Sequence, residues 1–364
     1  MSDTSLASAN DELPPAIELP GGWQSADLDA DQRWIAELDD LDRGEILSAF
    51  QSVRHLSTSE IDRDSFKAPR LAAKLSGFAE ELENGFGVSL LRGVPVEGLN
   101  DDDARGLCWA LGTQFAPALQ QNRKGDLIFP VRDDAGGRQQ DHSERIGELD
   151  ALTSFSRARS NGPLRFHTDG ADALSLLCVR SAASGGGNKL ASSVHVHNEI
   201  LRRRPDLHAL LCQDYYRTYE SDVPGGSQDY YRLPVFTRVG DKFSSQYSRT
   251  YVEEAQRLGA PKMTAAQDEA LDLLAEIAEE SCLRFRLEPG DLVFFNNHTC
   301  YHGRDPYDDD ASSAQDRLLY RLWFAPPNSR PLAPAYAKIW NAIDPGVLRC
   351  RNVEPAAVRK IPRP

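Results

Sequence analysis

The chain has 364 residues, 40% of them hydrophobic and 26% charged, so it can form an ordinary core in one large domain or two average ones. Its formal net charge of −14 argues against a nucleic-acid partner or an anionic membrane surface, because both favour clustered Lys and Arg. The chain start lacks a basic and apolar signal segment, no run approaches the roughly 18 apolar residues of a membrane span, and the six cysteines are scattered. We therefore expect a cytoplasmic protein that binds a small molecule; nothing in the composition indicates an oligomeric state.

The N-terminal part of the chain is predicted to be mainly helical. Residues 1–20 are acidic and polar and are expected to form a disordered tail, whereas residues 21–364 are expected to form a single domain. One helix is predicted between Pro69, a residue favoured in a first helical turn, and Gly85, a residue that ends helices. A short buried strand is predicted over 86–95, and an amphipathic helix with acidic residues at its start over 101–115.

Residues 132–163 differ from the rest of the chain. They are polar, contain several Gly and Ser residues, and show weak periodicity. A long irregular stretch inside a compact domain is usually a lid, a binding loop or a disordered segment. We expect this stretch to be a lid that shields a reactive site.

Short strands and helices alternate in the second half of the chain. The predicted elements are a strand at 173–182, a helix at 197–211 interrupted near Pro205, a hairpin at 214–236, helices near 250–258 and 264–281, and strands at 283–287, 292–297 and 318–325. Short strands with turn signals, packed between helices, indicate an α+β fold with a distorted jelly roll, also called a double-stranded β-helix. No Gly-rich phosphate loop follows a strand, so a nucleotide-binding fold is not supported.

The sharpest local motif is a His-x-Asp sequence, His167 and Asp169, followed by Gly170. Side chains alternate along a strand, so an imidazole and a carboxylate two residues apart at a strand edge point to the same side. The motif alone is weak, because a His and an Asp that cap a turn would look the same. The pair His195 and His197 has no neighbouring carboxylate to complete a metal site, and we expect it at a strand end or in a capping role.

A second motif strengthens the first. His302 follows a predicted strand and precedes Gly303, and Arg317 and Arg321 follow in the last predicted strand. Two His and one carboxylate form the facial triad of non-haem iron(II), which leaves positions open for a 2-oxoacid and for dioxygen. The planar fork of an Arg suits the distal carboxylate of such an oxoacid.

Together these residues resemble the taurine dioxygenase and clavaminate synthase-like group of 2-oxoglutarate-dependent oxygenases. The resemblance covers about residues 85–332, and its motifs are PLRFHTDGADALSLLCVR, SGGGNKLASS, FFNNHTCYHGR and DRLLYRLWF with its PPNSRPL sequel. The ordered set is far more specific than any single motif. It implies a jelly-roll core over about 85–332 flanked by helices, with iron(II) held by His167, Asp169 and His302.

The resemblance also implies roles for residues around the metal. Arg317 would bind the C5 carboxylate of 2-oxoglutarate, and Arg321 would lie nearer the primary substrate and meet an anionic group on it. Asn297 would support the site from behind the metal ligands. The family usually has Thr or Ser where this chain has Asn188, so cosubstrate binding by Asn188 is expected through its amide.

The reaction implied is oxidation of a small, carboxylate-bearing or amino-acid-like substrate by dioxygen, with conversion of 2-oxoglutarate to succinate and carbon dioxide. Gln121 and Asn122 are expected to line the substrate pocket. Because Asp169 is retained, halogenation is disfavoured and hydroxylation is expected. Three alternatives stay open: desaturation or ring closure with the same cofactors, a non-catalytic jelly-roll protein that binds a metal or ligand, and a zinc hydrolase on the same three residues.

Overall fold

The structure is a computed structural model, and it describes residues 16–17, 20–122, 124–133, 160–218, 230–309 and 316–349. Most of the expected tail at 1–20 and of the expected lid at 132–163 lies outside the described residues, so both stay predictions. Among the described residues, no helix is long and apolar enough to cross a membrane.

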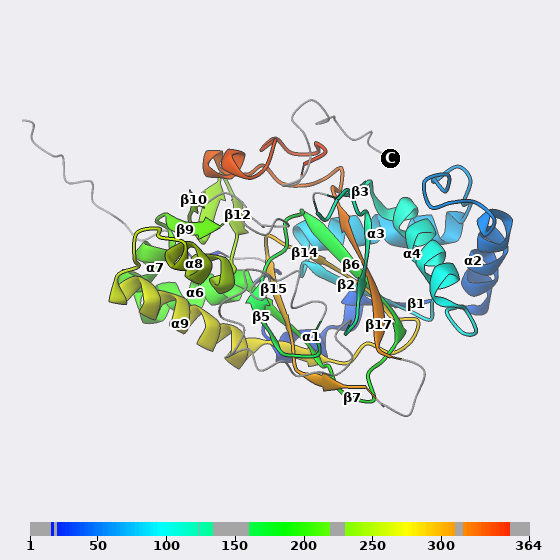
Figure 1. Cartoon of the computed structure of the whole chain (residues 1–364), viewed down its shortest axis with the longest axis horizontal. Coiled ribbons are helices and arrows are strands. Elements are labelled where there is room, and N and C mark those ends of the chain that lie inside the picture. Colours follow the sequence, from blue (N-terminus) through cyan, green and yellow to red (C-terminus); the bar gives the residue numbers. More distant parts are fainter. Residues whose placement is uncertain are drawn as a thin grey trace, which may run out of the picture.

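Two β-sheets form the centre of the molecule (Figure 1). The larger sheet has the strand order β1-β2-β14-β6-β17-β3, and β4 also pairs with β17. Its strands are β1 (Ile35–Glu37), β2 (Val88–Arg92), β3 (Ala118–Leu119), β4 (Ile128–Val131), β6 (Ala173–Arg180), β14 (Leu292–Asn296) and β17 (Leu318–Phe324). The smaller sheet has the order β13-β8-β15-β5. Its strands are β5 (Leu164–His167), β8 (Asn188–Ser192), β13 (Leu283–Phe285) and β15 (Cys300–Arg304).

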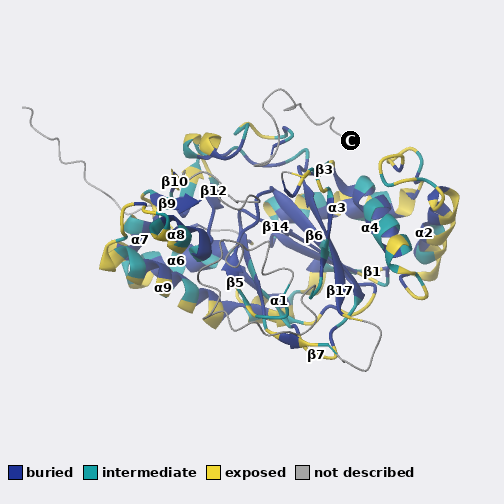
Figure 2. Cartoon of the chain, viewed as in Figure 1, coloured by how far each residue is buried: buried dark blue, intermediate teal, exposed yellow. Residues whose placement is uncertain are grey.

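Alternation along the strands explains how the two sheets pack. On β17, Leu319 and Trp323 belong to the apolar cluster that also contains Leu190 and Cys300 of the smaller sheet, so this face lies between the sheets. The residues between them on β17, such as Leu322, belong to the cluster formed with the N-terminal helices. The strand is buried on both faces, as the dark blue centre of Figure 2 shows. Arg321 lies two residues from both Leu319 and Trp323, so its side chain is on the same face of the strand and its guanidinium enters the space between the sheets.

Helices cover the outer faces of both sheets, as their separate positions in Figure 1 show. Helices α3 and α4 pack on the larger sheet, and α6, α7 and α9 on the smaller one. The helical elements are α1 (Ser25–Ala30), η1 (Gln32–Trp34), α2 (Asp40–Val53), α3 (Pro69–Asn84), α4 (Asp101–Phe115), α6 (Ser193–Arg203), α7 (Pro205–Leu211), α8 (Arg249–Arg257), α9 (Ala265–Ser281) and η3 (Pro334–Lys338). The predicted helices at 69–85, 101–115, 250–258 and 264–281 are therefore confirmed.

The remaining strands form short two-stranded pairs: β7 (Ser184–Gly185) with β16 (Tyr307–Asp308), β9 (Tyr215–Thr218) with β10 (Tyr230–Leu233), and β11 (Phe236–Val239) with β12 (Lys242–Ser245). The β9–β10 pair confirms the strands of the hairpin predicted over 214–236, whose turn lies outside the described residues.

One local prediction was wrong. His195 and His197 lie inside α6 and not at a strand end, because the side chain of Ser192 accepts a hydrogen bond from the backbone N–H of His195 and caps the helix there. The buried ring of His197 packs against His208, with ring centroids 4.5 Å apart.

The C-terminal segment returns to the core through two buried ion pairs. Arg330 pairs with Glu83 at 3.1 Å. Arg349 is fully buried and donates from Nη2 to Asp172 Oδ1 at 2.8 Å, while His298 Nε2 lies 2.7 Å from the same oxygen. Asp172 lies three residues after Asp169, so this segment holds the loop that carries the predicted metal carboxylate.

Candidate active site

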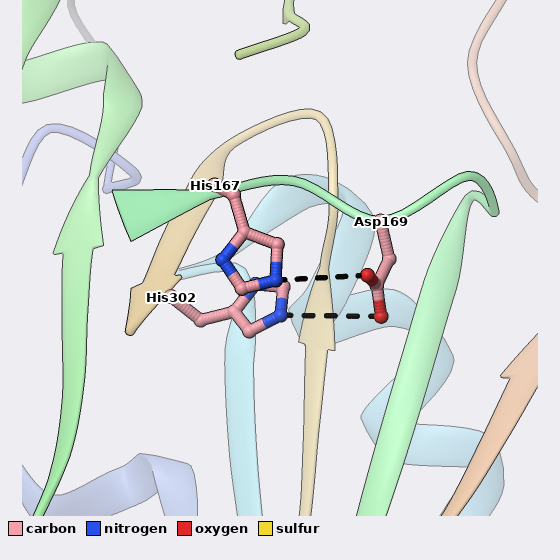
Figure 3. A group of neighbouring side chains, drawn as sticks. All are labelled: His167, Asp169 and His302. Atoms are coloured by element: carbon pink, nitrogen blue, oxygen red, sulfur yellow. Dashed lines mark ion pairs between the residues drawn. The ribbon is translucent and has the colours of Figure 1, made fainter. Parts of the chain in front are cut away.

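The three predicted metal ligands converge between the two sheets. His167 is the last residue of β5, and His302 lies directly opposite it on the antiparallel partner β15. His167 Nε2 is 3.7 Å from Asp169 Oδ1, and His302 Nε2 is 3.9 Å from Asp169 Oδ2 (Figure 3). One ligand atom from each residue lies within 4.8 Å of the others, which is close enough for all three to hold one ion.

The convergence arises differently from the expectation. Strand alternation was expected to bring His167 and Asp169 to the same side, but β5 ends at His167 and Asp169 lies in the loop that crosses to β6. The backbone N–H of Asp169 donates to the side-chain oxygen of Asn297 at 3.2 Å. The backbone N–H of Asn297 donates to the carbonyl of Asp172 at 2.9 Å. Asn297 thus holds the loop at two points.

The protonation states suit a divalent metal. His167 Nδ1 is 3.0 Å from the carbonyl of Arg165, so a proton on Nδ1 puts the lone pair of the ring on Nε2, the nitrogen that lies beside Asp169. Burial and then the charge of His167 hold the pKa of His302 well below its usual range, which keeps this ring neutral. Burial acts to raise the pKa of Asp169, but Arg321, the two histidines and Trp323 outweigh it and lower the pKa to about 2. Two neutral imidazoles and one carboxylate match the donor set of the iron(II) facial triad.

One oxygen of Asp169 is fully occupied by other residues. Arg321 Nη1 and Trp323 Nε1 each donate to Oδ2 at 2.9 Å. With Oδ2 held by two donors, Oδ1 is the oxygen available to a metal in this arrangement. Trp323 was missed in the sequence; its place two residues after Arg321 on a buried strand was the only local signal.

The predicted substrate residues divide into two groups. Gln121 accepts a hydrogen bond from Arg321 Nε at 2.8 Å and donates to the carbonyl of Arg321 at 2.8 Å, so it orients this arginine. Asn122 instead donates to Asp126 at 2.7 Å, and no hydrogen bond joins it to the triad in the described chain. Arg321 Nη2 makes no hydrogen bond with any part of the chain that the structure describes. Of the predicted substrate contacts, the structure therefore brings Arg321 and Gln121 to the metal site and leaves Asn122 apart.

A cavity of about 50 Å³ joins His302 to the predicted cosubstrate residues. Arg317, immediately before β17, and Asn188, at the start of β8, both line it, between apolar walls that include Phe295 and Leu319. The Nη1 of Arg317 is buried and has no hydrogen-bond partner among the described residues. Burial lowers the pKa of Arg317, but a guanidinium stays charged at neutral pH.

A larger cavity of about 530 Å³ lies elsewhere, where Trp109, Phe115 and Pro327 line it. None of the triad residues lines this cavity. Among the described residues that line it, Asp62 is the one carboxylate, and neither a His nor a Cys accompanies it to complete a metal site. We therefore assign the active site to the smaller cavity beside the triad.

Comparisons with known proteins agree with this class of site. FR-33289 synthase of Streptomyces rubellomurinus is 31% identical over 318 residues, covering 85% of this chain and 90% of that protein. The taurine hydroxylase-like protein SAT17 of Stachybotrys chartarum is 26% identical over 331 residues, covering 84% of this chain and 80% of that protein. Among solved structures, asparagine oxygenase with Fe(II), 2S,3S-3-hydroxyasparagine and succinate has a TM-score of 0.61 at 18% identity, covering 80% of this chain and 93% of that one. The non-haem iron oxygenase OrfP with Fe and alpha-ketoglutaric acid has a TM-score of 0.57 at 14% identity, with the same coverage.

The fold is the jelly-roll fold of the non-haem iron oxygenases, and His167, Asp169 and His302 form a group that could hold a metal ion. The family model described as "Taurine catabolism dioxygenase TauD, TfdA family" matches residues 52–323, and the chain belongs to this family. It is a 2-oxoglutarate-dependent dioxygenase that uses iron(II), 2-oxoglutarate and dioxygen. The predicted fold class, enzyme class and cofactors are confirmed.

Proposed function

We propose that the enzyme hydroxylates a C–H bond of a small substrate bearing a carboxylate or another anionic group, such as an amino acid. In this proposal His167, Asp169 and His302 hold iron(II), and Arg317 with Asn188 binds 2-oxoglutarate. Bound iron(II) supplies the oxidising chemistry, and the chain supplies ligand placement and exclusion of water. The names of the oxygenases that share the fold, which mention hydroxyasparagine and hydroxyarginine, support this substrate class.

The observation that carries the substrate proposal is the position of Arg321. Its guanidinium is only 7% exposed, lies 2.9 Å from the metal carboxylate, and keeps Nη2 without a partner among the described residues. Gln121 fixes its orientation from the opposite side. A substrate carboxylate that accepts hydrogen bonds from Nη2 would be held beside the metal.

A cytoplasmic location with a small-molecule partner is part of the same proposal. The described cysteines are all free thiols, which suits a reducing compartment.

The test begins with a screen of amino acids and other small carboxylates by succinate release. The best substrate is then compared with its neutral carboxamide in the wild type and in Arg321→Lys. We expect Arg321→Lys to raise KM for the acid by roughly 10- to 100-fold and to leave KM for the amide almost unchanged.

Trp323→Phe is the matched control, because it removes the other hydrogen bond to Asp169 Oδ2 and leaves the Arg321 guanidinium in place. If Arg321 acts only through Asp169, both variants will slow the acid and the amide alike, and the substrate role of Arg321 is wrong.

A further inference from the structure

Two arginines beside the triad are buried with no acid within ion-pair distance in the described chain, although Asp133 and Asp309 act on their charges from farther away. Arg304 is 2% exposed and Arg317 is 4% exposed, and both line the cavity that reaches His302. Neither guanidinium forms an ion pair within 4.0 Å in the part of the chain that the structure describes. Burying a charged group without a partner is costly, so such a pair points to a ligand that supplies negative charge.

Arg304 is already held in place on one side. It lies on β15 two residues after His302, and its Nη2 donates to the carbonyls of Ser160 and Gly162 at 2.6 and 2.5 Å. Its Nε and Nη1 are buried and have no hydrogen-bond partner among the described residues. The guanidinium is therefore positioned by one nitrogen while two donors remain available.

Tyr307 brings Arg304 and Arg317 to one place. The Cζ of Arg304 is 4.8 Å from the centre of its ring, and the Cζ of Arg317 is 4.9 Å from it. The hydroxyl of Tyr307 is also buried without a hydrogen-bond partner among the described residues. Gly185 allows this arrangement, because it pairs with Tyr307, has a φ of 69°, and a Cβ there would lie 2.3 Å from the carbonyl oxygen of Pro306.

Other cations near the cavity behave differently. Lys189 pairs with Glu279 at 3.1 Å, and Arg284 pairs with Asp305 at 2.9 Å. Their charges are balanced by the chain itself. The unbalanced charge is thus confined to the two arginines beside Tyr307.

We propose that Arg304 is a second arginine of the cosubstrate site and binds the distal carboxylate of 2-oxoglutarate together with Arg317. A carboxylate accepts hydrogen bonds at two oxygens, so each oxygen can take a donor from one guanidinium. The inference rests on the proposed role of Arg317. It adds a residue that sets the preference for a dicarboxylic 2-oxoacid over a monocarboxylic one.

The test compares 2-oxoglutarate with 2-oxopentanoate, which has a methyl group in place of the distal carboxylate. The iron(II)-loaded enzyme is titrated anaerobically with each compound, and binding is followed by the visible charge-transfer band of a bidentate oxoacid complex. In Arg304→Gln we expect the affinity for 2-oxoglutarate to fall roughly 10- to 100-fold and the affinity for 2-oxopentanoate to stay unchanged. The matched control is Arg284→Gln, which removes a nearby arginine that is already paired and should bind both compounds as the wild type does.

An equal loss of affinity for both compounds, or no loss for either, would overturn the role of Arg304. Arg317→Gln is titrated in parallel. If this variant alone keeps full affinity for 2-oxoglutarate, the proposed role of Arg317 fails. The role of Arg304 is still judged from the ratio of its affinities for 2-oxoglutarate and 2-oxopentanoate. If Arg304→Gln does not fold, Arg304→Lys keeps the positive charge and loses the fork, and the same selective loss is expected at a smaller size. If Arg304→Lys and the wild type show the same ratio of affinities for 2-oxoglutarate and 2-oxopentanoate, the inference is overturned.

Discussion

Two pairs of buried arginines stand in opposite situations in this enzyme. Arg330 and Arg349 each face a buried carboxylate, Glu83 or Asp172, and tie the C-terminal segment to the core. Arg304 and Arg317 are equally buried but face no carboxylate within ion-pair distance in the described chain. The first pair is complete within the protein, and we propose that a ligand completes the second.

This difference separates structural arginines from binding arginines without reference to any relative. A buried ion pair that loses one partner leaves an uncompensated charge, so stability falls sharply. A buried arginine that binds an anionic ligand already lowers the stability of the ligand-free protein, because its charge has no partner there. Its removal therefore lowers the affinity for the ligand and leaves folding intact. The predictions below test that separation.

The largest effect is expected for Arg349→Met. The substitution leaves Asp172 buried and charged beside His298, and we expect the free energy of unfolding to fall by about 3 to 5 kcal/mol, measured by urea denaturation. In an Asp172→Asn background, Arg349→Met should lower the free energy of unfolding clearly less, because it leaves no buried carboxylate charge without a partner. A loss below about 1 kcal/mol would mean that the pair behaves like an exposed ion pair.

Arg317→Gln should give the reverse pattern. Without 2-oxoglutarate, the free energy of unfolding is expected to stay equal or to rise, because an unbalanced buried charge is removed. The affinity for 2-oxoglutarate should fall roughly 10- to 100-fold, measured by anaerobic titration of the iron(II) enzyme. A large loss of stability in the absence of cosubstrate would place Arg317 with the structural arginines and break the comparison.

Asp169 combines a structural role with a binding role, because one of its oxygens accepts hydrogen bonds from the chain and the other is proposed to bind the metal. Trp323→Phe removes one of the two donors to Oδ2, and we expect iron(II) affinity to fall about tenfold, measured by competition with a metal-binding dye. Trp109→Phe is the matched control: its indole N–H donates to the carbonyl of Ile61 at 2.9 Å, away from the triad. Equal iron(II) affinity in the two variants would contradict a role for Trp323 in holding the carboxylate.

How much of the fold and of the candidate site could be predicted from the sequence depended on how far apart in the chain the interacting residues lie. The triad could be proposed because His167 and Asp169 are only two positions apart in the chain, and because His302 lies in a second recognisable motif. The helices at 69–85 and 101–115 followed from periodicity and end signals, since Pro69 and Gly85 act on the segment that contains them. The α+β jelly roll followed from the same local patterns.

Interactions between distant residues could not be predicted. Gln121 and Arg321 are 200 residues apart, and Arg349 is 177 residues from Asp172. Nothing in either local sequence indicates the partner. The start of helix α6 was placed too late for a related reason: the sequence predicted a helix from His197, whereas the cap at Ser192 starts it at Ser193, where it packs on the smaller sheet.

The smallest expected effect is a pH dependence of the free energy of unfolding, and it arises from His298 beside the buried pair of Asp172 and Arg349. Burial lowers the pKa of His298 to about 4, against a usual value of 6.5, although Asp172 acts to raise it. The unfolded chain therefore binds a proton at His298 before the folded protein does, so the stability contributed by neutral His298 is full above about pH 6.5 and is lost as the pH falls towards 4.

We expect the wild type to lose roughly 1 kcal/mol more than His298→Gln between about pH 7.5 and about pH 5.5, measured by urea denaturation. Gln can keep a donor towards Asp172 while removing the titrating group. Comparing the two proteins cancels the titration of the metal ligands, which both share. Parallel curves would contradict a lowered pKa for His298. A wild type that gains stability relative to His298→Gln as the pH falls would show instead that Asp172 draws a proton onto His298 at neutral pH, which would make the buried pair of Asp172 and Arg349 a three-charge cluster.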